Sequence, residues 1–352
     1  MRFLSHARPR SPADWVAAMA ASPHLALGLD SYSAGPAIAR LEDKVAGLLG
    51  KPAGLWFPKG VTAQQAVLKV HAARAGRQAV AIHPKSHIAI DEAGALERLA
   101  GLTAVRVGTD HRPFTVADLD KAAEPLAAVV VELPLRRSAF QAPTWPDLVA
   151  MSDWARARNA AFHLDGARIW EVQPWYGRPL AEIAGLADSV YVSLYKGLGG
   201  LGGCVLAGSA EVIEQARPWR ARYGGDLPTA FPMIVTALDG LETVLPTMGD
   251  YHRRAVELAA AIDAAPGLRA FPNPPHGNAF QVHFEVPAAA LGAAVLAEAE
   301  AAGTWLFNAV EPGLLPDRAS GELNVGAATM GWTTTEVVEA LTRLAQRAAA
   351  AG

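Results

Sequence analysis

Short apolar runs alternate with longer helical patterns over the first two thirds of the chain. The run Ala127–Val131 is apolar throughout, as a strand buried on both faces requires. Alternation of this kind predicts an α/β fold in which a mainly parallel sheet is covered by helices on both faces. The expected strands are Ala79–His83, Ala104–Val107, Ala127–Leu133, Ala160–Leu164, Ser189–Leu194 and Cys204–Ala207.

The composition and the predicted elements change at two places along the chain. Residues 1–40, rich in proline, serine and glycine, predict an irregular arm with one short helix. Beyond Arg222, long alanine-rich helices precede mixed strands and helices, which predicts a second α+β subdomain. We therefore expect a large domain over residues 1–240, including the arm, and a small subdomain over residues 241–352. The expected helices include Pro12–Ala21, Leu41–Leu49, Asp91–Ala100, Val116–Ala123, Pro146–Arg158, Pro228–Val244, His252–Ala265, Ala288–Ala302 and Thr334–Ala349.

Composition narrows the class of protein. The chain has 352 residues, of which 51% are hydrophobic, so it can bury a large core. A net charge of −3 without a basic stripe argues against nucleic acid and anionic membranes as partners. No apolar run is long enough to cross a bilayer, so no membrane-spanning segment is expected. The histidines lack zinc-type spacing, so no metal site is expected. Cys204, the only cysteine, permits no internal disulfide and fits a reducing cytoplasm.

One lysine stands in a glycine-rich loop between two apolar runs. The stretch from residue 188 to 208 reads DSVYVSLYKGLGGLGGCVLAG, and Lys196 is its only basic residue. Apolar and glycine neighbours remove water from an ammonium group and lower its pKa, which yields a nucleophilic amine suited to a Schiff base. Taken alone, the pattern is more typical of a surface lysine whose charge stays in water.

Three further segments place polar groups at the ends of apolar runs. Asp165, within HLDGAR, ends an expected strand where α/β sheets bind ligands, although aspartate is equally favoured as a helix N-cap. Gly60, Val61 and Thr62 open a helix whose N-terminal N–H groups can bind an anion. His87 follows another strand, a place where a lone histidine is more often structural.

Together these groups match the needs of one cofactor. A reactive amine, a carboxylate, a phosphate site and a flat side chain fit pyridoxal 5'-phosphate, whose ring is an electron sink when its nitrogen is protonated. Asp165 would keep that nitrogen protonated, and His87 would stack on the ring. The helix that begins near Gly60 would hold the phosphate.

The two most specific segments resemble a known family. HLDGAR, followed further along by SLYKGLGG, is similar to matching segments of the low-specificity threonine aldolases, in the β-eliminating lyase group of fold-type I pyridoxal-phosphate enzymes. The likeness covers roughly residues 1–245 and is much fainter beyond them. It implies an aspartate-aminotransferase-like large domain with a small C-terminal subdomain. It also implies a homodimer or homotetramer with its active site at a subunit interface.

The resemblance further implies roles for single residues. Lys196 would bind the cofactor covalently, and Arg168 would lie near the phenolic oxygen of the cofactor and the substrate carboxylate. Ser5 matches a serine that contacts substrate in the family. The implied catalytic residues are Lys196, His87 and Asp165; the implied cofactor contacts are Lys196, Asp165, Arg168, His87, Gly60, Val61 and Thr62; the implied substrate contacts are Ser5, Arg168, Tyr32 and Arg136.

The chain departs from the family on the substrate side. Leu135 replaces a histidine that is a candidate general base, and leucine cannot accept a proton. Arg136 and Arg137 follow, either as cations of the site or as solvated loop residues. The segment Glu322–Gly326 lacks the arginine that clamps the substrate carboxylate in the family, and Arg318 is the nearest candidate.

The expected activity is that of a pyridoxal-phosphate-dependent carbon–carbon lyase. It would cleave the Cα–Cβ bond of a β-hydroxy-α-amino acid to glycine and an aldehyde. In place of the missing histidine, the base would be His87, His6, a water or a group from a neighbouring subunit. The alternative is β-elimination, racemisation or a transaldol reaction on another amino acid. A third hypothesis is a non-catalytic binding protein that keeps the fold and the cofactor.

Overall fold

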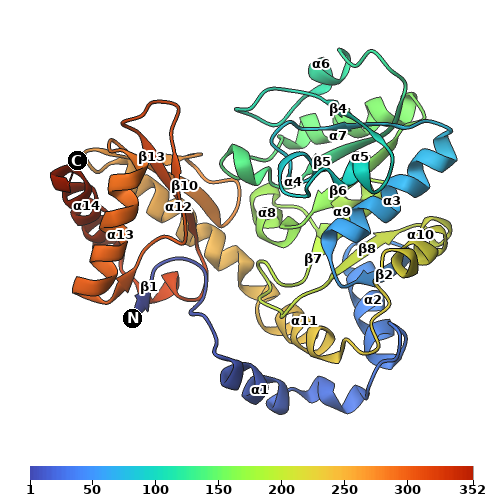
Figure 1. Cartoon of the computed structure of the whole chain (residues 1–352), viewed down its shortest axis with the longest axis horizontal. Coiled ribbons are helices and arrows are strands. Elements are labelled where there is room, and N and C mark those ends of the chain that lie inside the picture. The colour runs from blue at the N-terminus through green and yellow to red at the C-terminus, as the bar shows by residue number, and fades with distance from the viewer. Residues whose placement is uncertain (352) are drawn as a thin grey trace. The chain divides into compact units, whose positions relative to one another are not determined.

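The structure is a computed structural model that describes residues 1–351 (Figure 1). The chain divides into two compact units. The large unit comprises Pro12–Pro246, and the small unit joins Met1–Ser11 to the residues from Thr247 onward. Each unit has its own sheet and its own core.

A seven-stranded sheet forms the centre of the large unit, in the order β2-β8-β7-β6-β5-β3-β4. Strand β8 is antiparallel to both of its neighbours, and the other neighbouring pairs are parallel. The prediction of an α/β fold with a mainly parallel sheet is therefore confirmed. The strands are β2 (Ala53–Phe57), β3 (Ala79–Ile82), β4 (Thr103–Arg106), β5 (Leu126–Glu132), β6 (Ala161–Gly166), β7 (Ser189–Ser193) and β8 (Cys204–Gly208).

The strands near the middle of the sheet are apolar because helices cover both faces (Figure 1). In β5 every residue before Glu132 is buried. The helices of the large unit are α1 (Pro12–Ala21), α2 (Pro36–Leu48), α3 (Gly60–Ala75), α4 (His87–Ile90), α5 (Ala95–Arg98), α6 (Val116–Leu119), α7 (Trp145–Ala157), α8 (Ile169–Tyr176), α9 (Leu180–Gly185), α10 (Ala210–Arg222) and α11 (Phe231–Thr243), with short 3-10 helices at Pro23–Leu27, Arg136–Ser138 and Leu245–Thr247.

The single helix expected over Asp91–Ala100 is wrong in its extent, because only α5 (Ala95–Arg98) lies in that range and α4 already ends at Ile90. Ala93 and Gly94 lie between them with φ angles of +52° and +71°, in the left-handed region, which ends a right-handed helix. The break leaves Glu92 in the turn that follows α4, where its side chain is buried. Glu92 is thereby placed against the side chain at the start of α4.

The carboxyl ends of three strands meet along one edge of the sheet. Glu132 is the register partner of Asp165, and Asp165 is the register partner of Tyr191. Neighbouring strands lie about 4.8 Å apart, so two acidic side chains and a phenol are brought side by side at the end where α/β sheets bind ligands.

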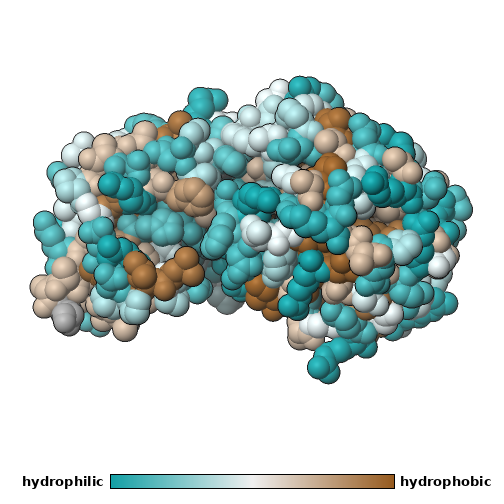
Figure 2. Space-filling view, turned by 90° about the horizontal axis from the view of Figure 1, so that it is seen from above, coloured by the Kyte–Doolittle hydropathy of each residue, from teal (hydrophilic) through white to brown (hydrophobic). Residues whose placement is uncertain are grey.

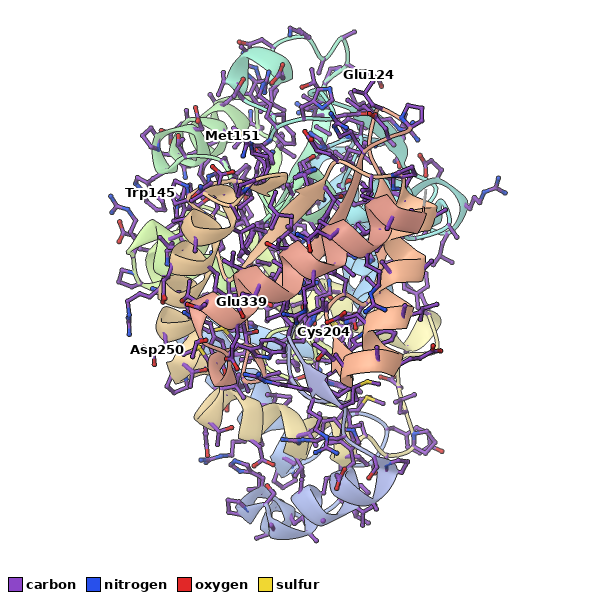
Figure 3. The ribbon with its side chains drawn as sticks, turned by 90° about the vertical axis from the view of Figure 1, so that its left-hand side faces the viewer. Glu124, Trp145, Met151, Cys204, Asp250 and Glu339 are labelled. Atoms are coloured by element: carbon purple, nitrogen blue, oxygen red, sulfur yellow. The ribbon has the colours of Figure 1, made fainter. Side chains whose placement is uncertain are left out.

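Strands β7 and β8 and their glycine-rich loop form the hairpin expected around Lys196. The loop turns back because Gly200 donates its N–H to the carbonyl of Leu194 at 3.0 Å, and a Cβ at Gly200 would lie 2.7 Å from that oxygen. Cys204 begins β8 (Figure 3), is fully buried, and donates its thiol to the carbonyl of Phe57.

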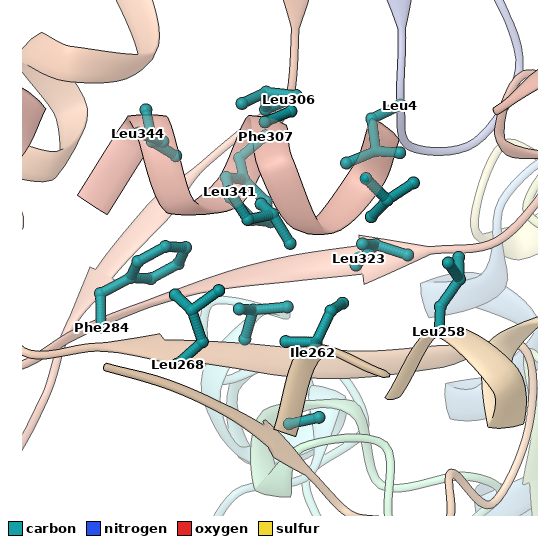
Figure 4. Close-up of a cluster of buried hydrophobic side chains, with 14 of the residues drawn as sticks. Leu4, Leu258, Ile262, Leu268, Phe284, Leu306, Phe307, Leu323, Leu341 and Leu344 are labelled. Carbon is teal, nitrogen blue, oxygen red and sulfur yellow. The ribbon is translucent and has the colours of Figure 1, made fainter. Parts of the chain in front are cut away.

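The small unit is an α+β layer with a four-stranded antiparallel sheet, in the order β12-β13-β10-β9. Apolar side chains from the sheet and from three helices form its core, with Leu258, Leu323 and Leu341 among them (Figure 4). The elements are β9 (Leu268–Phe271), β10 (Ala279–Phe284), β12 (Val310–Pro312), β13 (Ala319–Asn324), α12 (Met248–Asp263), α13 (Ala288–Ala302), α14 (Thr334–Ala351) and a 3-10 helix at Thr329–Gly331.

The first residues of the chain belong to the small unit, whereas the sequence placed all of residues 1–40 in the large domain. Strand β1 (Arg2–Phe3) pairs in parallel with β11 (Thr304–Trp305). Leu4 is fully buried in the core of the same unit (Figure 4). Pairing and burial therefore remove the beginning of the arm from the large unit.

The surface is mostly hydrophilic on the face shown in Figure 2, with smaller apolar patches between the polar residues. Among the helices of residues 1–351, none is both long and apolar enough to cross a membrane. The same residues contain no group of three or more histidine, cysteine or acidic side chains arranged to bind a metal ion.

Candidate active site

A pocket in the large unit opens at the carboxyl edge of the sheet. It collects residues from the start of α3, from α4, from the ends of β6 and β7, and from the β7–β8 loop. Five of the residues singled out in the sequence lie together here. The lining residues are Lys59, Gly60, Val61, Gln64, His87, Glu92, Asp165, Ala167, Tyr191, Tyr195 and Lys196.

Lys196 is half-buried in this pocket. Loss of water around its ammonium group lowers its pKa, and the positive charge of Arg168 lowers it further. The negative charges of Asp165, Glu132 and Glu171 oppose the shift without cancelling it. An amine of this kind gives up its proton more readily than an exposed lysine, as a nucleophile requires.

Asp165 is the last residue but one of β6, and only 2% of its surface is exposed. Its Oδ1 accepts the backbone N–H of Ala167 at 3.2 Å. Burial raises the pKa of its carboxyl above the ordinary value, and the positive charges of Lys196 and His87 only partly oppose this rise. The N-cap of α8 is Arg168, so the alternative role of Asp165 as a helix cap does not apply.

His87 begins α4 and faces two carboxylates. Its Nδ1 lies 3.0 Å from Oε1 of Glu92, and its backbone N–H donates to Oε2 of Glu132 at 2.7 Å. The hydrogen bond to Glu92 raises the pKa of the His87 ring. Gln65 donates to the other oxygen of Glu92 at 2.9 Å, so this carboxylate is fixed at both ends. The ring of His87 is thus held by Nδ1, which leaves Nε2 for a ligand.

Glu132 joins the two loops that flank the pocket. Its oxygens accept backbone N–H groups of His87, at 2.7 Å, and of Arg136, at 3.2 Å. Burial is the main cause that raises the pKa of the Glu132 carboxyl to about 7, and the negative charge of Asp165 is the second cause. Sequence reasoning assigned no role to Glu132 or Glu92. Glu132 contacts His87 across 45 residues of sequence, and Glu92 meets the His87 ring only because the chain turns after α4.

The first turn of α3 supplies backbone donors. The N-cap, Lys59, makes no side-chain cap, so N–H groups at the start of the helix face the pocket without one. A Cβ at Gly60 would lie 2.3 Å from Oη of Tyr191, so this position requires glycine. Val61 lines the pocket, whereas Thr62 donates its hydroxyl to the carbonyl of Lys59 at 2.8 Å. This helix start can bind an anion through its backbone.

Arg168 lies close enough to Lys196 to influence its pKa, although it does not line the pocket. Its Nη1 lies 3.3 Å from Oε1 of Glu171, and its guanidinium stands over the ring of Phe140. Oε2 of Glu171 is buried without a hydrogen-bond partner. A Cβ at Gly197 would lie 2.6 Å from Glu171, so Glu171 packs directly behind the lysine loop.

Three other predicted substrate residues are not among those that line this pocket. Tyr32 is in the large unit, 67% exposed, and outside the pocket lining. Arg136 reaches the site through its backbone bond to Glu132. Ser5 belongs to the small unit, where its Oγ accepts the N–H of Asn324 at 3.0 Å. Leu135 is buried, and its apolar side chain offers no proton acceptor.

Curated proteins similar to this chain include aldolases from several kingdoms. The chain is 29% identical over 279 residues to the aldolase vrtJ of Penicillium aethiopicum, covering 77% of this chain and 71% of that protein. It is 28% identical over 255 residues to the low specificity L-threonine aldolase of Escherichia coli, covering 70% and 74%.

Solved structures share the fold over nearly the whole length. A protein described as an L-allo-threonine aldolase from Listeria monocytogenes matches with a TM-score of 0.92 and 32% identity, covering 99% of this chain and 96% of that one. An aromatic amino acid beta-eliminating lyase/threonine aldolase from Exiguobacterium matches equally well, at 33% identity. The family model described as beta-eliminating lyase matches residues 14–286. The chain therefore belongs to the β-eliminating lyase family.

Proposed function

We propose that the protein is a pyridoxal-phosphate-dependent carbon–carbon lyase that cleaves a β-hydroxy-α-amino acid to glycine and an aldehyde. The observation that carries the proposal is the convergence of Lys196, Asp165 and the start of α3 in one pocket. The family is pyridoxal-phosphate dependent, and relatives of this chain include L-threonine aldolases. The sequence led to the same function.

The polar groups of the pocket fit this cofactor. Asp165 is buried, and only one of its oxygens accepts a hydrogen bond within residues 1–351. Its other oxygen would pair with the ring nitrogen, and the free N–H groups near Gly60 and Val61 would hold the phosphate. The amine of Lys196 would hold the cofactor aldehyde, and His87 would lie against the ring. When bound, the pyridoxal ring supplies a sink for the electron pair released at Cα.

The reaction needs two proton transfers, and a different residue of this chain would carry out each of them. A base takes the proton from the substrate β-hydroxyl as the Cα–Cβ bond breaks and the aldehyde leaves. The electron pair left on Cα then takes up a proton, which gives glycine. We assign the first transfer to His87, because Glu92 fixes its Nδ1 and leaves Nε2 as a proton acceptor. We assign the second to Lys196, whose pKa is lowered by burial and by Arg168.

The remaining candidate contacts complete the proposal. Arg168 would balance the negative charge of the phenolic oxygen and of the substrate carboxylate. We also propose Ser5, Tyr32 and Arg136 as substrate contacts, on the resemblance alone. The resemblance likewise supports a homodimer or homotetramer with the active site at the subunit interface, which sedimentation analysis at several concentrations would test. A cytoplasmic location stays a prediction from the single cysteine.

Product analysis tests the reaction. Purified protein loaded with pyridoxal phosphate is incubated with L-threonine, L-allo-threonine and β-phenylserine, and glycine and aldehyde are measured. Stoichiometric glycine and aldehyde are expected from at least one of the three. Release of ammonia and a keto acid without glycine would replace the proposal by its alternative, β-elimination. That alternative would fit the missing family histidine at Leu135, because the hydroxyl group departs in β-elimination and needs no base.

A further inference from the structure

Four polar side chains form a continuous chain through the core of the large unit, directly behind the pocket. Gln64 and His71 lie on α3, His163 on β6 and Ser189 on β7. Nε2 of His163 is 2.6 Å from Oε1 of Gln64, and Nδ1 of His163 is 2.7 Å from Oγ of Ser189. Nε2 of His71 is 2.8 Å from the same hydroxyl. All four are at most 4% exposed.

The protonation of the two histidines sets the direction of these hydrogen bonds. Burial lowers the pKa of His163 to about 3 and that of His71 to about 4, so both rings are neutral near pH 7. The amide oxygen of Gln64 only accepts, so Nε2 of His163 carries the hydrogen. Nδ1 of His163 then accepts from Ser189, whose oxygen in turn accepts the N–H of His71.

The contact with His163 also shows which end of the Gln64 amide faces the pocket. Gln64 lines the pocket beside Lys59, Gly60 and Val61, one turn into α3. Its oxygen is held by His163 on the core side. Within residues 1–351 no protein group accepts a hydrogen from its Nε2. The side chain of Gln64, which is 1% exposed, therefore presents an N–H donor without a protein partner to the pocket, where a bound ligand can accept its hydrogen.

We propose that Gln64 donates a hydrogen bond to an anionic oxygen of the bound cofactor, and that His163, Ser189 and His71 hold its amide in the donating orientation. The proposal rests on the proposed function for the identity of the ligand. Gln64 touches the cofactor, whereas the other three are positioning residues that act through it. The acceptor is an oxygen of the phosphate or of the phenol, the two anionic groups of pyridoxal phosphate.

Cofactor titration of the apo-protein tests the contact without relying on turnover. Gln64→Leu removes the donor and is expected to weaken binding of pyridoxal phosphate about tenfold, the effect of one lost hydrogen bond to a charged group. Gln64→Glu places an anion there and should weaken binding further. Ser189→Ala frees the amide to rotate and should weaken binding by a smaller factor. Ser152→Ala changes a buried serine whose hydroxyl donates to the carbonyl of Leu186; it is the matched control and should bind as the unmodified protein does.

Pyridoxal without its phosphate distinguishes the two acceptors. If Gln64→Leu binds pyridoxal phosphate more weakly but pyridoxal equally well, the phosphate accepts the hydrogen bond. If it binds both compounds more weakly by the same factor, the phenolic oxygen accepts it. Unchanged affinity in both Gln64 variants would overturn the contact. Circular dichroism of each variant confirms that it has folded.

The nitrogen-15 spectrum of the histidines in the unmodified apo-protein tests the direction of these hydrogen bonds without any variant. We expect a neutral His163 with its hydrogen on Nε2. A hydrogen on Nδ1 would turn the carbonyl of Gln64 toward the pocket and overturn the proposal. This measurement needs no cofactor, so its result stays distinct from a failure of the proposed function, which would appear as no binding by the unmodified protein.

Discussion

Nδ1 of His87 lies 3.0 Å from Oε1 of Glu92 in the turn between α4 and α5. Glu92 is buried, and Gln65 holds its second oxygen, so the carboxylate cannot swing away from the ring. A fixed negative charge stabilises the imidazolium form, which is why the pKa of His87 is raised. One carboxylate therefore controls both the orientation and the protonation of the proposed base.

Replacing Glu92 by glutamine should move the pH dependence of the reaction. The neutral form of His87 is needed to accept a proton, so activity is lost as pH falls through its pKa. Glu92→Gln removes the charge that raises this pKa, and the acidic limb of the kcat/KM profile should shift to lower pH. Initial rates of glycine formation across the pH range measure the shift.

Glu97→Gln is the matched control for this change, because Glu97 lies on α5 with its side chain exposed. Its profile should coincide with that of the unmodified protein. If the acidic limb of Glu92→Gln also stays in place, His87 is not the group that titrates, and the base must be sought among waters or a neighbouring subunit.

Removal of the Lys196 amine should abolish covalent attachment of the cofactor. Lys196→Ala is expected to lose the visible absorbance of the lysine-bound cofactor and to turn over at least about a thousandfold more slowly. Borohydride should fix the cofactor to the unmodified chain but not to the variant. Lys51→Met is the control, since burial also lowers the pKa of Lys51, which donates to the carbonyl of Ala187. Full activity in Lys196→Ala would end the assignment.

The apolar runs were sufficient to predict the central strands of the large sheet, because strands buried on both faces leave a continuous hydrophobic signal. The expected strand Ala127–Leu133 differs from β5 by one residue at each end. The prediction for Asp91–Ala100 was wrong because Ala93 adopts a left-handed backbone conformation, which the residue type alanine does not indicate. The small-unit membership of Met1–Ser11 depends on pairing with a strand near the other end of the chain, which no local pattern reveals.

The chemistry of the site was only partly accessible from sequence. Lys196 and Asp165 stand in motifs, so their residue types and positions indicated a function. The contacts of Glu132 and of the Gln64–His163 pair join segments far apart in the chain, and only the folded sheet brings them together. The interpretation of Leu135 as a lost base rests on its residue type alone and stays a prediction.

The absence of a side chain at Gly60 should matter for the cofactor. A Cβ there would lie 2.3 Å from the Tyr191 hydroxyl, so Gly60→Ala must displace either the phenol or the start of α3. We expect destabilisation of about 1–3 kcal/mol and weaker pyridoxal phosphate binding. Urea unfolding of the apo-protein and cofactor titration measure the two effects.

Gly47→Ala provides the comparison for Gly60→Ala. Gly47 lies in α2, and nothing lies within 4 Å of a Cβ at this position. Alanine should therefore stabilise the helix by about 0.5–1 kcal/mol and leave cofactor binding unchanged. Similar behaviour of the two alanine variants would mean that the contact between Gly60 and Tyr191 does not constrain the pocket.

The raised pKa of Glu132 predicts a pH-dependent loss of stability. Its pKa is about 7 in the folded protein, against 4.5 as its ordinary value. Between these values the folded protein keeps a proton that the unfolded chain has released, so the contribution of Glu132 to the free energy of unfolding falls as pH rises and levels off above about 7. Glu132→Gln removes this contribution. The difference in free energy of unfolding between the unmodified protein and the variant should change by up to about 3 kcal/mol across this interval.

Urea unfolding of the apo-proteins between pH 4.5 and 8 measures that difference. Glutamine also loses one acceptor for the N–H groups of His87 and Arg136, but this loss shifts the variant by an amount independent of pH, so the slope isolates the titration. Glu124→Gln, at an exposed position just before β5, should run parallel to the unmodified protein. A Glu132→Gln curve that is also parallel would mean that Glu132 is ionised in the fold at pH 5. Its carboxylate would then be held by the two loop N–H groups alone, without the proton that its place beside Asp165 otherwise requires.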